Sequence, residues 1–180
     1  KHAKGNAPAT WVEIADYLLF LDIDDIDIPG ADIQESPGLV VAEIVDRLGA
    51  DFADVSYCWY FSGGQKPDGD LIKLRLVFFT DQALTNEEKK RWAKSCPVVV
   101  DQNIYKAGGL VFTADPLFFG SKGESLPDWL PVRRGIIQGE RDTVSLTLPD
   151  APQRPVPAFI PEGERIHAPG VLKPLVAAIE

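Results

Sequence analysis

The 180-residue sequence predicts an α/β (α+β) domain, because apolar strands and amphipathic helices follow one another along it. Residues 17–24 are apolar and end in aspartates, and residues 71–79 alternate with a period of two. Thr85-Asn86-Glu87-Glu88 is a capping box that opens a helix. These three patterns predict a sheet combined with helices.

Composition and charge limit the classes of protein to which this chain can belong. A chain that is 45% hydrophobic at this length buries one substantial core. We expect a cytoplasmic location and no membrane partner, because no apolar run approaches the roughly 20 residues needed to span a bilayer and no signal peptide opens the chain. The net charge of −9 argues against a non-specific nucleic-acid coat protein, although it is compatible with a local basic groove. A chain with no Met that begins with Lys is expected to be a segment of a longer protein.

The first half of the chain alternates strand and helix. Residues 17–24 form the first strand, and Ser36-Pro37 supplies an N-cap and a first-turn proline for a helix that ends near Gly49. Residues 55–61 form a second apolar strand, and a loop over residues 62–70 leads into the strand 71–79. In that strand Lys73 and Arg75 face away from its apolar side. This cationic face needs an explanation.

The second half begins with the capped helix, which runs through Cys96 with its Lys and Arg side chains toward solvent. Residues 97–100 are apolar and lead to Asp101, and short strands are expected at 110–114 and 143–148. Prolines crowd the chain from residue 149, so we predict a domain over residues 1–148 and a linker with the start of a helical segment over 149–180. Both cysteines, Cys58 and Cys96, are predicted to be buried free thiols.

Asp22 and Asp24 are the strongest functional signal. At i and i+2 on a strand they share one face, and carboxylates at the end of a buried strand are costly to desolvate unless a cation or a hydrogen-bond network compensates them. Together with Asp101 they offer the oxygen ligands that Mg²⁺ or Mn²⁺ prefers, while Lys73 and Arg75 offer charge to phosphates. This set suits nucleotidyl transfer. Each part also has a plainer interpretation, as a capping carboxylate or as decoration of an exposed sheet.

The order of these motifs resembles the archaeo-eukaryotic-type primase and primase-polymerase superfamily, particularly its helicase-fused branch in phages, plasmids and integrated elements. The strand LFLDIDD resembles its first motif, and FSGGQKPDGDLIKLRLVFF its second. VVVDQNIY resembles its third motif, and LVFTADPLFFG the segment after it. Arg133 with the later Gly139 also fits. The resemblance covers about residues 15–148.

This resemblance implies an RRM-like mixed sheet flanked by helices, and a DNA primase that acts on a single-stranded DNA template with NTP or dNTP beside a helicase domain. It implies that Asp22, Asp24 and Asp101 are catalytic and bind the metal. Triphosphate would be bound by Ser62, Lys73, Arg75 and Arg133. The chain departs from the family at Arg75, where the second motif usually carries His; Arg can still donate a bidentate fork to phosphate, and catalytic rate and nucleotide choice are left open.

Three alternatives stay open. A non-catalytic replication-initiator or origin-binding module would keep the fold, and Arg75 favours it. An aspartate-nucleophile phosphatase of the haloacid-dehalogenase type also begins with a strand ending in Asp-x-Asp, but Asp25 stands where that family wants Thr or Val. A structural domain with surface carboxylates is the third.

Overall fold

A computed structural model describes residues 14–67, 71–106, 111 and 113–151. The chain divides into two units, Lys1–Asp150 and Ala151–Glu180, and every element named below belongs to the first. The predicted helix at 171–179, and the predicted linker beyond residue 151, lie outside the described residues. Across the described ranges, no helix has the length and apolar character that crossing a membrane requires.

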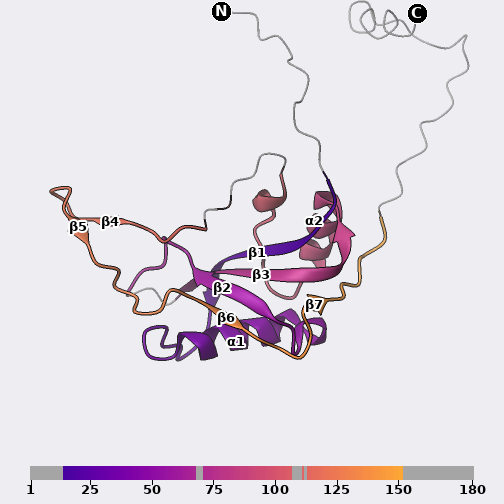
Figure 1. The fold of residues 1–180 in the computed structure, drawn as a ribbon, viewed down its shortest axis with the longest axis horizontal. Coiled ribbons are helices and arrows are strands. Elements are labelled where there is room, and N and C mark those ends of the chain that lie inside the picture. The colour runs from indigo at the N-terminus through magenta and orange to yellow at the C-terminus, as the bar shows by residue number, and fades with distance from the viewer. Residues whose placement is uncertain (1–13, 68–70, 107–110, 112, 152–180) are drawn as a thin grey trace, which may run out of the picture. The chain divides into compact units, whose positions relative to one another are not determined.

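The fold is a mixed α/β domain, as the sequence predicts. The five-stranded sheet has the order β1-β3-β2-β6, with β7 paired to β3, and β4 and β5 form a separate hairpin (Figure 1). All neighbouring pairs on the main path are antiparallel, whereas β7 runs parallel to β3. The strands are β1 (Asp16–Asp27), β2 (Tyr57–Phe61), β3 (Leu71–Leu84), β4 (Phe118–Phe119), β5 (Ser125–Leu126), β6 (Arg134–Ile137) and β7 (Thr143–Val144). The helices are α1 (Pro37–Leu48) and α2 (Asn86–Ser95), with short 3₁₀ turns η1 (Ala50–Phe52) and η2 (Gln102–Tyr105).

Local sequence explains where the two helices begin. Ser36 stands at the N-cap of α1, although its side chain makes no capping hydrogen bond there. Pro37 is the first residue of the helix, where a missing N–H costs nothing. Thr85 caps α2 through the predicted capping box, in which Glu88 accepts a bond from the Thr85 N–H at 2.8 Å. Gly49 ends α1 at φ 109°, a backbone conformation that glycine adopts without strain.

The core lies on one face of the sheet. Alternate residues of β1, β2 and β3 point into it, and they form one cluster with the apolar sides of α1 and α2. Phe52 of η1 contacts the rings of Phe78 and Trp92, with centroids 4.9 and 5.6 Å away. Because both helices contribute to this single cluster, the intervening residues of the three strands face the other way. We call that side of the sheet the open face.

Several details differ from the sequence prediction. β1 and β3 are longer than expected, and the predicted strand at 143–148 is reduced to Thr143–Val144. Residues 110 and 112 of the predicted strand 110–114 are outside the described set, and residues 111, 113 and 114 are not in a strand. The prediction that both cysteines are buried is wrong: Cys58 is exposed, because it lies on the open face, and Cys96 is half-buried.

Candidate functional site

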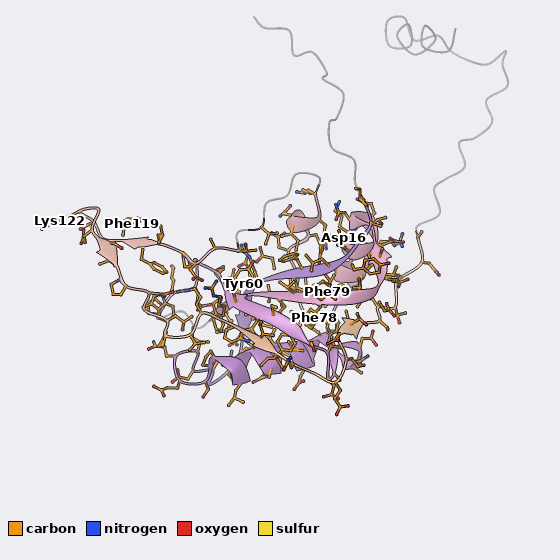
Figure 2. All side chains as sticks on the ribbon, viewed as in Figure 1. Asp16, Tyr60, Phe78, Phe79, Phe119 and Lys122 are labelled. Carbon is orange, nitrogen blue, oxygen red and sulfur yellow. The ribbon has the colours of Figure 1, made fainter. Side chains whose placement is uncertain are left out.

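A row of polar side chains crosses the open face from strand to strand. Asp22 of β1 is opposite Arg75 of β3, Arg75 is opposite Tyr60 of β2, and Tyr60 is opposite Arg134 of β6. The guanidinium of Arg75 lies 5.6 Å from the centroid of the Tyr60 ring. Figure 2 labels Tyr60 at the left-hand end of the strands in that view. This polar row brings predicted site residues from distant parts of the sequence onto one line.

The next row across the sheet is mainly apolar. Phe20, Val77, Cys58 and Ile136 occupy equivalent positions on β1, β3, β2 and β6. With Tyr60, they line a cavity of about 870 Å³ whose other wall is Thr113–Pro116. Ser62, Gly63, Gly64 and Arg75 stand at the same cavity. The open face therefore carries a hollow with an apolar floor and a basic side chain beside it.

Asp22 and Arg75 form the central ion pair. Arg75 Nε donates to Asp22 Oδ1 at 2.9 Å, and Arg75 Nη2 lies 3.5 Å from Asp22 Oδ2. The side chain of Asp22 is 14% exposed and that of Arg75 is 19% exposed. Burial opposes the charge, but the hydrogen bond and the negative charge of Asp22 together raise the pKa of Arg75.

A β-bulge directs the next two carboxylates. The register shifts between Ile23 and Ile26 of β1, and Asp25 has φ 60°, a region that few residues other than glycine, asparagine and aspartate adopt. As a result Asp24 and Asp25 both reach Lys73, whose Nζ lies 3.3 Å from Asp24 Oδ1 and 2.8 Å from Asp25 Oδ1. The bonds to Asp25 and Asp24 raise the pKa of Lys73.

Asp101 lies beside β1. Its N–H donates to the carbonyl oxygen of Asp22 at 2.8 Å, and the Tyr105 hydroxyl donates to the carbonyl of Phe20. These two bonds place the segment after α2 along the outer edge of β1. Asp24 and Asp101 both line a hollow of about 620 Å³, together with Lys90 and Lys106. The structure thus places Asp101 beside β1, with its main chain bonded to that of Asp22 and its side chain at the same hollow as Asp24.

The carboxylates are not gathered around a common point. Among the described ranges, no group of three or more His, Cys, Asp and Glu side chains is placed to hold a metal ion. Asp22 binds Arg75, Asp24 binds Lys73, and Asp101 accepts from the Asn103 N–H at 2.9 Å. The donor chemistry still fits Mg²⁺ or Mn²⁺, which is often bound by one or two carboxylates plus substrate phosphates and water.

The Ser62 loop is held rigidly against β3. Gln65, which is 3% exposed, accepts from the Lys73 N–H at 2.7 Å and donates to the carbonyl of Leu71. Ser62 Oγ accepts from the Gly64 N–H at 3.3 Å. A side chain on Gly63 would stand 3.1 Å from Pro116 across the cavity. Ser62 therefore lies at the cavity in a loop that a buried glutamine, which the sequence did not single out, holds against β3.

Arg133 has a structural environment. It is 7% exposed, and its guanidinium binds Asp128 and the carbonyl of Ser62. Arg133 therefore supports the Ser62 loop through a main-chain contact. Arg134, the next residue, lies on the open face, is paired with Asp115 at 3.0 Å, and was not predicted. The period of two in β6 separates the two arginines, but such a short strand gave no signal in the sequence.

Alternation also identifies the residues that we missed on β2. Cys58 and Tyr60 point to the open face because Tyr57, Trp59 and Phe61 are buried in the core. The period of two was present in the sequence of β2, yet the strand is apolar on both faces and was treated only as core.

Comparison of the chain with protein-family models, with curated proteins and with solved structures found no match. The family resemblance and the functional argument consequently depend on the motifs and the geometry.

Proposed function

We propose that this chain is a template-dependent nucleotidyltransferase of the primase-polymerase kind. The observation that carries the proposal is the pairing of Asp22 and Asp24 on β1 with Arg75 and Lys73 on β3. Of these residues, Arg75 also lines the cavity with the apolar floor. A nucleoside triphosphate has matching parts: a polyanion for the two basic side chains and a flat base for the apolar floor. The cavity volume of about 870 Å³ falls within the usual range for such ligands.

The strand order supports the same proposal. β1 and β3 are neighbours, β2 pairs with the other edge of β3, and the segment after α2 lies along the free edge of β1. Both helices cover one face, and the other face carries the site. On the basis of this order we propose that the sheet is RRM-like. We infer that single-stranded DNA would approach the open face, and that a helicase domain accompanies this segment in a longer chain.

The residues have distinct roles in this proposal. Asp22, Asp24 and Asp101 would leave their present partners, Arg75, Lys73 and Asn103, to hold Mg²⁺ or Mn²⁺. The cation would supply charge stabilisation to the phosphates and activation of the attacking hydroxyl. Lys73 and Arg75 bind the triphosphate of an NTP or dNTP, and Ser62 contributes its hydroxyl and backbone at the cavity wall. Tyr60 and the apolar row position the base.

Synthesis tests the enzyme proposal. The chain is incubated with single-stranded DNA, Mn²⁺ and either NTPs or dNTPs, and oligonucleotide products are separated on a gel. Asp22→Ala and Asp101→Ala should abolish the product, while Glu43→Gln on α1 should not. Because synthesis can depend on the proposed helicase partner, nucleotide binding needs its own measurement.

Cys58 provides that measurement. It lies in the floor of the cavity and is exposed, so a maleimide should label it, and a nucleotide bound over the apolar row should slow the labelling. Mass spectrometry separates Cys58 from Cys96, whose pKa burial raises. Unchanged labelling of Cys58 at millimolar nucleotide with Mn²⁺ would exclude the proposed nucleotide site.

One observation favours a second candidate. The two-point contact between Arg75 and Asp22 occupies a carboxylate that a polymerase needs for its cation. A non-catalytic replication-initiator or origin-binding module of the same fold would use such a pair only to stabilise the sheet. Protection of Cys58 by single-stranded DNA, without protection by nucleotides and without synthesis, would favour this function. A haloacid-dehalogenase-type phosphatase would instead release phosphate from small phosphomonoesters.

A further inference from the structure

Each ion pair at the site joins a side chain that would bind phosphate to a side chain that would bind a metal cation. Arg75 binds Asp22, and Lys73 binds Asp24 and Asp25. Each basic side chain that a phosphate would use is therefore bound to a carboxylate that a metal cation would use. The pairing follows from the register of β1 and β3, which sets Asp22 directly opposite Arg75.

These contacts oppose either ligand when it arrives alone. A cation at Asp22 must displace the guanidinium of Arg75 or bind beside its positive charge. A phosphate at Arg75 meets the negative charge of Asp22 in the same way. Because the two side chains are largely shielded from solvent, salt and water screen these repulsions less than at an open surface.

The same contacts assist the two ligands when they arrive together. The cation takes the place of Arg75 at Asp22, and the phosphate takes the place of Asp22 at Arg75, so every charge keeps a partner. Binding of one ligand then raises the affinity for the other by the same factor, as thermodynamic linkage requires. Arginine suits this role, because its charge persists throughout the physiological pH range, whereas histidine would lose its charge.

We propose that Asp22 and Asp24 form a divalent-cation site that opens when a polyphosphate ligand takes over Arg75 and Lys73. This inference depends on the proposed function for the identity of that ligand as a nucleoside triphosphate. Asp25 is a positioning residue here: through the bulge it holds Lys73 beside Asp24, and its release of Lys73 accompanies phosphate binding.

Binding of Mn²⁺ alone tests the cation half, with free Mn²⁺ followed by electron paramagnetic resonance. Arg75→Gln should bind Mn²⁺ about tenfold more tightly than the unmodified chain, the size expected when a competing charged hydrogen bond is removed. The gain should disappear in the double variant Asp22→Asn/Arg75→Gln. Arg134→Gln removes the same charge from the same face without touching Asp22, and should change the affinity less than about twofold. Equal effects of Arg75→Gln and Arg134→Gln would overturn the proposal.

Folding of each variant is checked by thermal denaturation, because Arg75→Gln leaves Asp22 without this partner. Should that variant fail to fold, Lys73→Gln replaces it: Lys73 is more exposed, and its loss should tighten Mn²⁺ binding through Asp24. An Mn²⁺ affinity unchanged by Lys73→Gln would then count against the proposal.

The anion half is tested without metal. In EDTA, a nucleoside triphosphate should protect Cys58 from maleimide at about tenfold lower concentration in Asp22→Asn than in the unmodified chain. Glu43→Gln, which breaks the Glu43–Arg47 pair on α1, is the matched control and should have no effect. Protection that is equal in Asp22→Asn and the unmodified chain contradicts the coupling and leaves the nucleotide site standing. Absence of protection in every variant, with and without Mn²⁺, contradicts the nucleotide site itself.

Discussion

Gly135 of β6 is the position where one added methyl group should disturb the sheet most directly. It is opposite Trp59 in the β2–β6 pairing, and Trp59 is 4% exposed in the core. A Cβ at residue 135 would lie 2.7 Å from Cζ2 of the Trp59 ring and 2.8 Å from its Cε2 and Nε1. The indole cannot retreat freely, because Phe61 contacts it edge-on with centroids 5.5 Å apart.

The expected magnitude follows from this overlap. Overpacking a buried aromatic ring by one methyl group costs about 2 kcal/mol, which for a domain of this size lowers Tm by about 6 °C. Relief of the clash would require β6 to move outward, and this would also shift Arg134 and Ile136 at the cavity. Gly135→Ala should therefore weaken nucleotide protection of Cys58 as well as stability.

Thermal unfolding followed by circular dichroism measures the effect. Gly38→Ala in α1 is the matched control: nothing lies within 4 Å of the added methyl group, so the substitution should stabilise the helix by about 0.5 kcal/mol. In a Trp59→Leu background the ring atoms that collide are gone, and Gly135→Ala should cost much less. A Tm for Gly135→Ala equal to that of the unmodified chain, or an equal loss in both backgrounds, would refute the reasoning.

Three further predictions concern contacts that stabilise the fold. Thr85→Ala removes the N-cap of α2 and should lower the free energy of unfolding by about 1 kcal/mol, measured by urea titration. Arg133 holds the pKa of Asp128 below its ordinary value. This pair therefore stabilises the fold above the ordinary aspartate pKa of about 3.9, and the contribution is lost as pH falls through the lowered value; Asp128→Asn should flatten that part of the stability–pH curve. Asp16→Ala should cost about 2 kcal/mol more than Lys89→Met, because it leaves the buried ammonium of Lys89 unpaired.

Each of these predictions has a contrary outcome. A Thr85→Ser variant as unstable as Thr85→Ala would show that the hydroxyl is not the relevant group. Identical acid unfolding of Asp128→Asn and the unmodified chain would remove the Arg133 argument. Lys89→Met less stable than Asp16→Ala would show that the ammonium of Lys89 tolerates the loss of Asp16, contrary to the argument.

The sequence predicted the features that depend on local chemistry. The apolar run into Asp22, the period of two around Arg75 and the capping box at Thr85 are set by neighbours a few residues away, and the structure contains all three. The positions of Lys73 and Arg75 on a face away from the core follow from that period alone. The α+β class was predictable for the same reason.

Features that depend on distant contacts were not predicted. Lys89 was expected in solvent with the other basic side chains of α2, but it is 3% exposed and binds Asp16 at 2.7 Å, so that expectation is wrong. A lysine stem can be buried along apolar surface when its charge reaches a carboxylate. The sequence of α2 does not indicate that Asp16 of β1 lies within reach of Lys89. The bulge at Asp25 likewise depends on how β1 and β3 register.

The hydrogen bond from the Asp101 N–H to the Asp22 carbonyl has a consequence for substitutions at these two positions. It joins the two acidic segments through main-chain atoms, which any pair of residues other than proline at 101 can supply. Substitutions of the side chains at 22 and 101 can therefore leave the two segments side by side, because the bond that joins them uses no side-chain atom.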